Sequence, residues 1–152
     1  MLIMSDDLQT FATLLHQCAA LWRSRLDERL RPWGISQTAW RTLWLLNAAE
    51  ERYNQSTLAH RLGIETPTLV RMLDRLESLS LVQREPDSRD RRQKYVVITP
   101  HGKQLMAEVD TEVIATRRRM LAGIDADELS EGIALVERII GNARSMGGQG
   151  KP

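Results

Sequence analysis

Residues 55–79 contain two amphipathic helical patterns separated by a single glycine, Gly63. Gln55 or Ser56 is expected to begin the first helix. Thr66 is expected to cap the second, with Pro67 as its first residue. Apolar residues recur at steps of three or four, as on the buried face of a helix. They are Leu58, Ala59 and Leu62 in the first pattern and Leu69, Met72, Leu73, Leu76 and Leu79 in the second. Two short helices joined by a glycine turn predict a helix-turn-helix.

The second of these helices directs polar side chains away from its apolar stripe, as a recognition helix does in the major groove of DNA. Arg71 is the candidate for base contact, because arginine can form two hydrogen bonds with guanine. Thr68 is a candidate for a base edge or a phosphate. Thr66 lies at the helix N-terminus, where backbone N–H groups favour a phosphate. Arg75 is a candidate for the DNA backbone, although both arginines could also be ordinary exposed residues of an amphipathic helix.

A basic loop between two β-favouring runs follows the helix pair. The runs LVQRE and KYVVIT predict a β-hairpin, called the wing below, with the loop at its tip. The chain has 21 basic and 20 acidic residues, so its positive charge is local to this loop. Between Ser88 and Lys94 the cations are Arg89, Arg91, Arg92 and Lys94, against the single carboxylate of Asp90. Such loops are usually solvated, but this one follows a helix-turn-helix, and a slender cationic hairpin suits the narrow minor groove.

Further amphipathic helices are predicted on both sides of this region. They are expected to begin at Asp6, after the N-cap Ser36, at Pro100 after the cap Thr99, and at Asp125 or Asp127. The predicted fold is mainly α with a small β-hairpin wing. Residues 36–99 would form a winged helix-turn-helix lobe, and residues 6–31 and 100–144 would form N- and C-terminal dimerisation helices. Residues 145–152 are expected to be disordered.

The apolar stripes of the flanking helices are too long for one small lobe to cover. They run over residues 8–30, 105–124 and 129–140. Faces of this length are expected to bury each other across a two-fold axis. The stripes therefore predict a homodimer.

Other function classes find little support in the sequence. The three histidines are scattered, and no Ser-His-acid set, glycine-rich phosphate loop or metal-binding spacing occurs, so no enzyme, cofactor or metal is expected. The single cysteine, the absence of signal-peptide features and the short apolar runs favour a cytoplasmic protein without a membrane span. A winged helix that binds only proteins remains an alternative. It would be favoured if the arginines of the wing and recognition helix were paired with acids within the fold.

Residues 64–102 resemble the winged helix-turn-helix core of the MarR regulators, through the segment DSRDRR and the following TPHG. Within that family the chain is most similar to the SlyA branch, through DERLRPWGISQTAW and PTLVRMLDRLE. The resemblance implies an obligate homodimer that binds a pseudopalindromic DNA operator, most often as a ligand-responsive repressor. It also implies that Arg92 enters the minor groove, with Arg91 beside it and Asp90 holding the turn. With Arg89, these residues complete the predicted DNA-binding set of the wing.

Three tryptophans, Trp22, Trp40 and Trp44, lie in the first two predicted helices. They are expected to pack where the dimerisation helices meet the DNA-binding lobe. The family resemblance implies in addition that an aromatic carboxylate binds at this junction. Such a ligand needs aromatic walls and one cation, for which Arg23 and His16 are the candidates. Cys18 falls on the apolar stripe of the first helix and is predicted to be a small packing residue.

Overall fold

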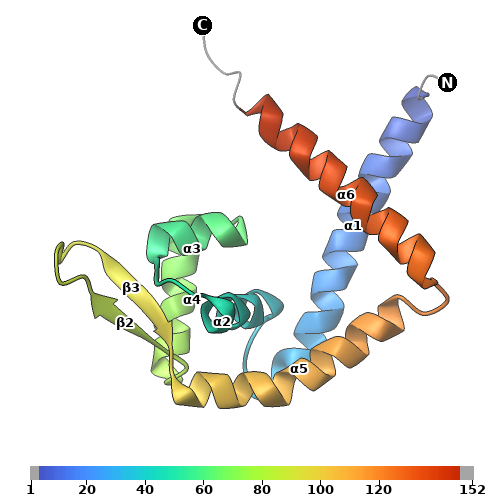
Figure 1. The fold of residues 1–152 in the computed structure, drawn as a ribbon. Helices are drawn as coiled ribbons and strands as arrows, with labels where there is room; N and C mark the ends of the chain where they lie inside the picture. Colours follow the sequence, from blue (N-terminus) through green and yellow to red (C-terminus); the bar gives the residue numbers. More distant parts are fainter. Residues whose placement is uncertain (1–3, 148–152) are drawn as a thin grey trace, which may run out of the picture. The chain divides into compact units, whose positions relative to one another are not determined.

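The computed structural model describes residues 4–147 and confirms a mainly α-helical chain with a small antiparallel sheet (Figure 1). The chain divides after Arg117, within helix α5 (Pro100–Met120), into two compact units. The first contains α1 (Ser5–Leu30), a 3-10 turn (Arg31–Trp33), α2 (Gln37–Ala48), α3 (Gln55–Leu62), α4 (Thr66–Ser78), the sheet and most of α5. The second contains α6 (Ala126–Met146). None of the helices within residues 4–147 has the length and hydropathy needed to cross a membrane.

Local side-chain and backbone contacts explain where the helices of the first unit begin and end. Ser36 accepts a hydrogen bond from the Ala39 amide at 3.0 Å and caps α2. Gly63, with φ of +66°, ends α3 in the left-handed conformation, as the sequence predicts. Two predicted caps are wrong. Asn54, rather than Gln55 or Ser56, caps α3 by accepting from the Thr57 amide. Thr66 is itself the first helical residue of α4, with the extended residue Glu65 before it.

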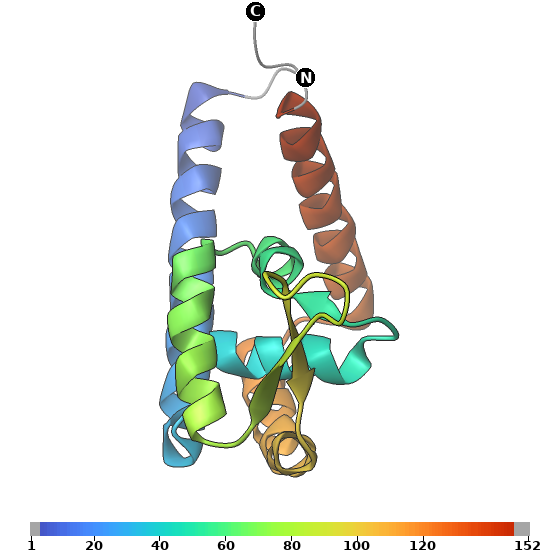
Figure 2. The same cartoon turned by 90° about the vertical axis from the view of Figure 1, so that its left-hand side faces the viewer.

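The sheet has three antiparallel strands in the order β1-β3-β2. The predicted wing hairpin is confirmed as β2 (Val82–Pro86) and β3 (Lys94–Ile98), with Val82 opposite Ile98 and Pro86 opposite Lys94. Figure 2 shows this hairpin next to α4. The sequence analysis missed β1 (Tyr53–Asn54), which pairs with the other edge of β3. A strand of two residues is too short to show an alternating pattern.

The core of the first unit gathers leucine and valine side chains from helices and sheet. The fully buried ones are Leu26, Leu30, Leu43, Leu58, Leu69, Leu73, Leu76, Leu81, Val82, Val96, Val109 and Val113. Two residues of the predicted α4 stripe are less buried: Met72 is half-buried, and Leu79, which follows the last helical turn, is 40% exposed. Burial of the other three stripe leucines leaves the opposite face of α4 free.

The stripe of α1 packs within the chain only at its C-terminal end. Leu26 and Leu30 are buried, whereas Leu8, Phe11 and Leu15 are exposed. Cys18, predicted to be a packing residue, is also exposed in this chain. The single-chain fold therefore leaves an apolar face on the N-terminal two-thirds of α1.

The wing is joined to α5 by a tight contact around Thr99 and Gly102. The Thr99 hydroxyl donates to the Ser80 carbonyl at 2.6 Å and accepts from the Gly102 amide at 3.0 Å. The Thr99 amide donates to the Leu81 carbonyl at 3.1 Å. A side chain at Gly102 would collide with that same Leu81 oxygen, so glycine is required there. The Thr-x-x-Gly pattern thus fixes the start of α5 against the turn between α4 and β2.

In the second unit, α6 begins with a capping box at Asp125. The Asp125 carboxylate accepts from the amides of Asp127 and Glu128 at 2.9 Å, and the Glu128 carboxylate accepts from the Asp125 amide at 3.0 Å. The helix continues to Met146, so the prediction of disorder from residue 145 is wrong for its first two residues. Residues 148–152 of that predicted tail lie outside the described residues.

Candidate nucleic-acid interface

The outward face of α4 presents the polar side chains that the sequence analysis singled out. Thr66, Thr68 and Arg71 are exposed, and Arg71 lies on the side of the helix opposite Leu69 and Leu73. Arg71 forms no ion pair or side-chain hydrogen bond with any residue in the part of the chain that the structure describes. Its guanidinium is therefore available to an external acceptor.

Arg75 differs from Arg71, because its side chain is already engaged. One guanidinium nitrogen, Nη2, donates to the Gly34 carbonyl at 2.9 Å. This bond links α4 to the turn between α1 and α2, where Gly34 has a φ of +72°. A contact between Arg75 and the DNA backbone stays a prediction. Such a contact would require the hydrogen bond to Gly34 to be shared or broken.

The tip of the wing is shaped by two carboxylates that accept from backbone amides. Asp87 accepts from the Arg89 amide at 2.9 Å, and Asp90 accepts from the Arg92 amide at 3.0 Å. The Gln93 amide donates to the Asp90 carbonyl at 3.0 Å, so Asp90 holds the turn from both its side chain and its backbone. The acids of the loop thus order its backbone.

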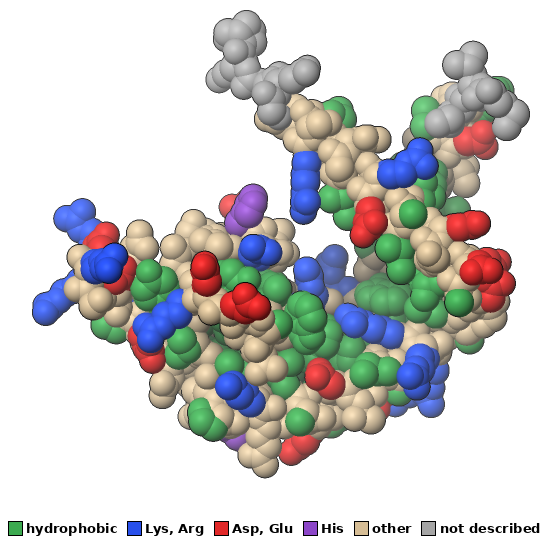
Figure 3. Space-filling view, viewed as in Figure 1, with side chains coloured by type: hydrophobic (Ala, Val, Ile, Leu, Met, Phe, Trp, Pro, Cys, Tyr) green, Lys and Arg blue, Asp and Glu red, His purple; other side chains and the backbone are tan. Residues whose placement is uncertain are grey.

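The arginine side chains of this loop remain free. Arg89, Arg91 and Arg92 are exposed and form no ion pair within residues 4–147. Figure 3 shows Lys and Arg side chains gathered at this end of the hairpin. The condition that would have favoured a module binding only proteins, arginines neutralised within the fold, is not met at the wing tip or at Arg71.

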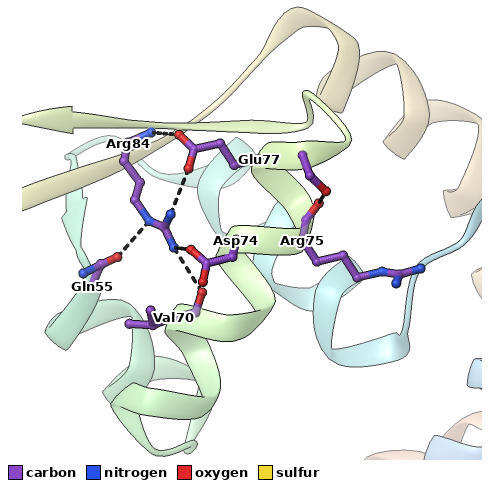
Figure 4. A network of polar contacts seen from close by, with 7 residues as sticks. Gln55, Val70, Asp74, Arg75, Glu77 and Arg84 are labelled. Carbon is purple, nitrogen blue, oxygen red and sulfur yellow. Dashed lines mark hydrogen bonds and ion pairs between the residues drawn. The ribbon is translucent and has the colours of Figure 1, made fainter.

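The arginine of the wing that is neutralised within the fold is Arg84 on β2, which the sequence analysis did not single out. Its side chain is 13% exposed and reaches over one flank of α4. It forms ion pairs with Asp74 at 2.7 Å and Glu77 at 2.8 Å. It also donates to the Gln55 side chain at 2.9 Å and the Val70 carbonyl at 3.0 Å. Figure 4 shows this network, with Arg75 pointing to the other side of the helix.

A cavity of about 410 Å³ lies between α2, α3 and α5 and contains two of the predicted ligand residues. Trp40 and Trp44 line it, together with Arg41, Arg61 and Arg117. The Arg117 guanidinium lies 4.8 Å from the centre of the Trp40 ring, a cation–π distance. The Trp40 indole donates to the Asp110 carboxylate at 2.8 Å. The cavity therefore combines aromatic walls with an excess of positive charge.

The surroundings of Arg117 change the pKa of its guanidinium. Burial, and then repulsion from Arg41, lower the pKa of the Arg117 guanidinium, while Asp110 opposes the change. Its Nε atom is buried and has no hydrogen-bond partner among the described residues. A half-buried cation whose buried Nε is an unused donor is suited to an anionic ligand.

The other predicted ligand residues lie elsewhere. Trp22 and Arg23 line a second hollow of about 270 Å³, with Cys18, Gln37 and Arg41. His16 is exposed and lines neither cavity. The structure thus separates the five residues that the sequence analysis grouped. The first cavity contains three other arginines, Arg41, Arg61 and Arg117, in place of Arg23 and His16. Arg41 lines both cavities. Within residues 4–147, no group of three His, Cys, Asp or Glu side chains could hold a metal ion.

Comparison with known proteins relates this geometry to a family of regulators. Residues 35–94 match the family model described as "MarR family". The structure of transcriptional regulator PA3341 is 38% identical, covers 89% of this chain and 98% of its own, and has a TM-score of 0.79. AbsC, a MarR family transcriptional regulator from Streptomyces coelicolor, is 25% identical over 95% and 99% of the two chains, with a TM-score of 0.82. The S. aureus MepR–DNA complex shares the fold at 20% identity, with coverage of 87% and 97% and a TM-score of 0.79.

Proposed function

The chain belongs to the MarR family of transcriptional regulators, and from this we propose that it is a repressor whose homodimer binds a pseudopalindromic DNA operator and releases it on binding a small effector. The observation that carries the proposal is the contrast between two sets of arginines. Arg84 is neutralised inside the fold, whereas Arg71 and the wing-tip arginines are exposed and form no ion pair with any residue that the structure describes. Free guanidinium groups placed on a recognition helix and a hairpin suit phosphates and base edges.

In the proposed complex, α4 enters the major groove and the wing enters the adjacent minor groove. Arg71 reads a guanine, Thr68 contacts a base edge or a phosphate, and Thr66 contacts a phosphate at the helix N-terminus. Arg92, with Arg91 and Arg89 beside it, inserts where the minor groove is narrow. The presence of DNA in the MepR structure, which has the same fold, supports DNA as the partner. The similarity to the SlyA branch stays a prediction.

Selection of duplexes from a random pool tests the DNA-binding function. The purified protein is expected to enrich an inverted repeat and to bind it with a Kd of roughly 10⁻⁸ to 10⁻¹¹ M at physiological salt. It should bind a scrambled duplex at least about 10³-fold more weakly. Equal affinity for selected and scrambled duplexes would contradict sequence-specific binding and would leave a module that binds only proteins as the better candidate.

We propose that the exposed apolar faces of α1 and α6 form the homodimer interface. Phe11 on α1 and Ile133 on α6 are 44% and 52% exposed in the chain, and neighbouring apolar residues on each helix are similarly exposed. Apolar side chains that recur on one helical face and stay exposed indicate an interaction surface. Closed two-fold symmetry is the commonest way to cover such a face.

Light scattering at micromolar concentration is expected to give twice the mass of the 17.4 kDa chain. Phe11→Glu should shift the equilibrium toward monomer, because it places a carboxylate within the apolar face. Thr13→Glu is the matched control, since Thr13 is exposed on the opposite side of α1 and bonds only within its own helix. A monomeric wild-type chain would exclude the proposed interface.

We propose that the cavity beside Trp40 and Trp44 holds an aromatic carboxylate. The tryptophans would contact its ring, and the cationic set Arg41, Arg61 and Arg117 would bind its carboxylate. The ligand can weaken operator binding only to the extent that it prefers the conformation with lower DNA affinity.

Salicylate at high micromolar to millimolar concentration is therefore expected to quench tryptophan fluorescence and to weaken operator binding. Arg117→Met should raise the half-saturating concentration roughly tenfold, as expected for losing a hydrogen bond to a charged group. Arg23→Met serves as the control, because Arg23 lines the other hollow. If Arg23→Met shows the larger effect, the effector binds beside Trp22. If salicylate changes neither signal, this chain has lost the family's effector site or uses another ligand.

A further inference from the structure

Arg84 links the two parts of the proposed DNA-binding surface, the recognition helix α4 and the wing. We propose that Arg84 is a positioning residue that fixes these parts as one rigid unit and thereby sets the distance along DNA between the major-groove and minor-groove contacts. The inference rests on the proposed DNA-binding function and assigns a role to a residue that does not itself touch DNA.

The contacts of Arg84 run along a single flank of α4. The guanidinium bonds the Val70 carbonyl, the Asp74 carboxylate and the Glu77 carboxylate, at 3.0, 2.7 and 2.8 Å. These three positions follow one another on adjacent helical turns, so the side chain spans about two turns of α4. Rotating or sliding α4 against the wing would break several of these bonds at once.

The same side chain also anchors the first helix of the helix-turn-helix. Its Nε atom donates to Gln55, the first residue of α3, at 2.9 Å. The preceding residue, Asn54, belongs to β1 and pairs with β3. Arg84 therefore connects β2 to both helices, while β1 and β3 connect the sheet to the same point from the other edge.

Burial distinguishes Arg84 from an ordinary surface ion pair. The nearby pair of Arg52 with Glu85 has side chains that are 62% and 41% exposed, whereas the Arg84 side chain is 13% exposed. Exposed pairs contribute little and exchange readily with water. A guanidinium held in the planar geometry of several charged and neutral acceptors constrains the elements that it joins.

The network also neutralises negative charge on the recognition helix. Asp74 and Glu77 remain 61% and 43% exposed beside the face that carries Arg71. Unpaired carboxylates at this place would repel the phosphates of DNA. By pairing with both, Arg84 offsets part of that repulsion while it holds the helix.

The test is the dependence of binding on the spacing within the operator. A duplex selected by the wild-type protein is compared with one in which the A·T-rich flank is moved by one base pair relative to the half-site core. The wild-type dimer is expected to lose roughly tenfold in affinity on the shifted duplex, comparable to one mismatched base pair. Arg84→Met should bind the matched duplex more weakly and lose less than about twofold on the shifted one, because its wing is no longer held in register with α4. Arg52→Met is the control and should keep the wild-type spacing penalty.

A folded Arg84→Met dimer that keeps the full spacing penalty would overturn the proposal and leave Arg84 a residue of fold stability alone. A wild-type protein without any spacing penalty would overturn it as well. If Arg84→Met does not fold, the double variant Asp74→Asn with Glu77→Gln replaces it. Removing two negative charges should then raise overall affinity while lowering the spacing penalty, and an unchanged penalty would again refute the idea. If the wild-type protein selects no duplex at all, the proposed function itself fails.

Discussion

Replacement of Gly102 by alanine is expected to lower the free energy of unfolding by roughly 3 kcal/mol, the upper part of the usual range for overpacking a core. Gly102 is buried, and an added Cβ would collide with the Leu81 carbonyl oxygen and press against the Ile98 side chain. The carbonyl cannot move away freely, because it accepts the Thr99 amide. The clash would separate the start of α5 from the turn between α4 and the wing.

Chemical denaturation at a fixed protein concentration measures this effect. Gly141→Ala is the matched control, since Gly141 is exposed inside α6 and an added Cβ there meets no other atom of residues 4–147 within 4 Å. That variant is expected to be as stable as the wild type or more stable by about 0.5–1 kcal/mol, because alanine favours helix. A Gly102→Ala protein with wild-type stability would show that the contact around Thr99 is looser than described.

The helices and strands that could be predicted well are those whose residue pattern lies within one continuous segment of the sequence. The leucines of α4 recur at helical spacing and are buried, and the two wing strands are short β-favouring runs on either side of a polar loop. The ends of elements were less predictable. Asn54 was missed as a cap because it precedes a run in which Gln55 and Ser56 are also polar, and β1 was missed because it exists only through its pairing with β3.

The residues of the candidate site also differ in how far the sequence could predict them. Exposure of Arg71 follows from its position on the helix, so it could be predicted from one element. The roles of Arg75 and Arg84 could not, because their partners Gly34 and Gln55 lie on other elements of the chain. The cavity beside Trp40 is likewise built from three helices, and its arginines carry no local signal that distinguishes them from other exposed arginines.

Replacement of Arg71 by alanine is expected to cost roughly 1–3 kcal/mol of binding free energy on the selected operator. The loss should be accompanied by relaxed base preference at one position in each half-site, because the guanidinium would no longer read a base edge. The two recognition helices of the proposed dimer should lie about 34 Å apart, one turn of DNA, so both half-sites should be affected equally. Arg52→Ala is the control, since Arg52 is exposed and paired with Glu85. Affinity reduced equally on every sequence would instead identify Arg71 as a phosphate contact.

The central claim, that the free arginines of the wing bind the minor groove, is tested most directly with Arg92→Ala. Its affinity and that of the wild type are measured over a salt series, on operators with A·T-rich and with G·C-rich flanks. The variant is expected to lose most affinity on the A·T-rich flank, where a narrow groove concentrates negative potential, and its salt slope should fall by about one. Unchanged affinity on both flanks at every salt concentration, with the oligomeric state of the variant unchanged, would show that the basic tip of the wing is a solvated loop that does not bind the minor groove.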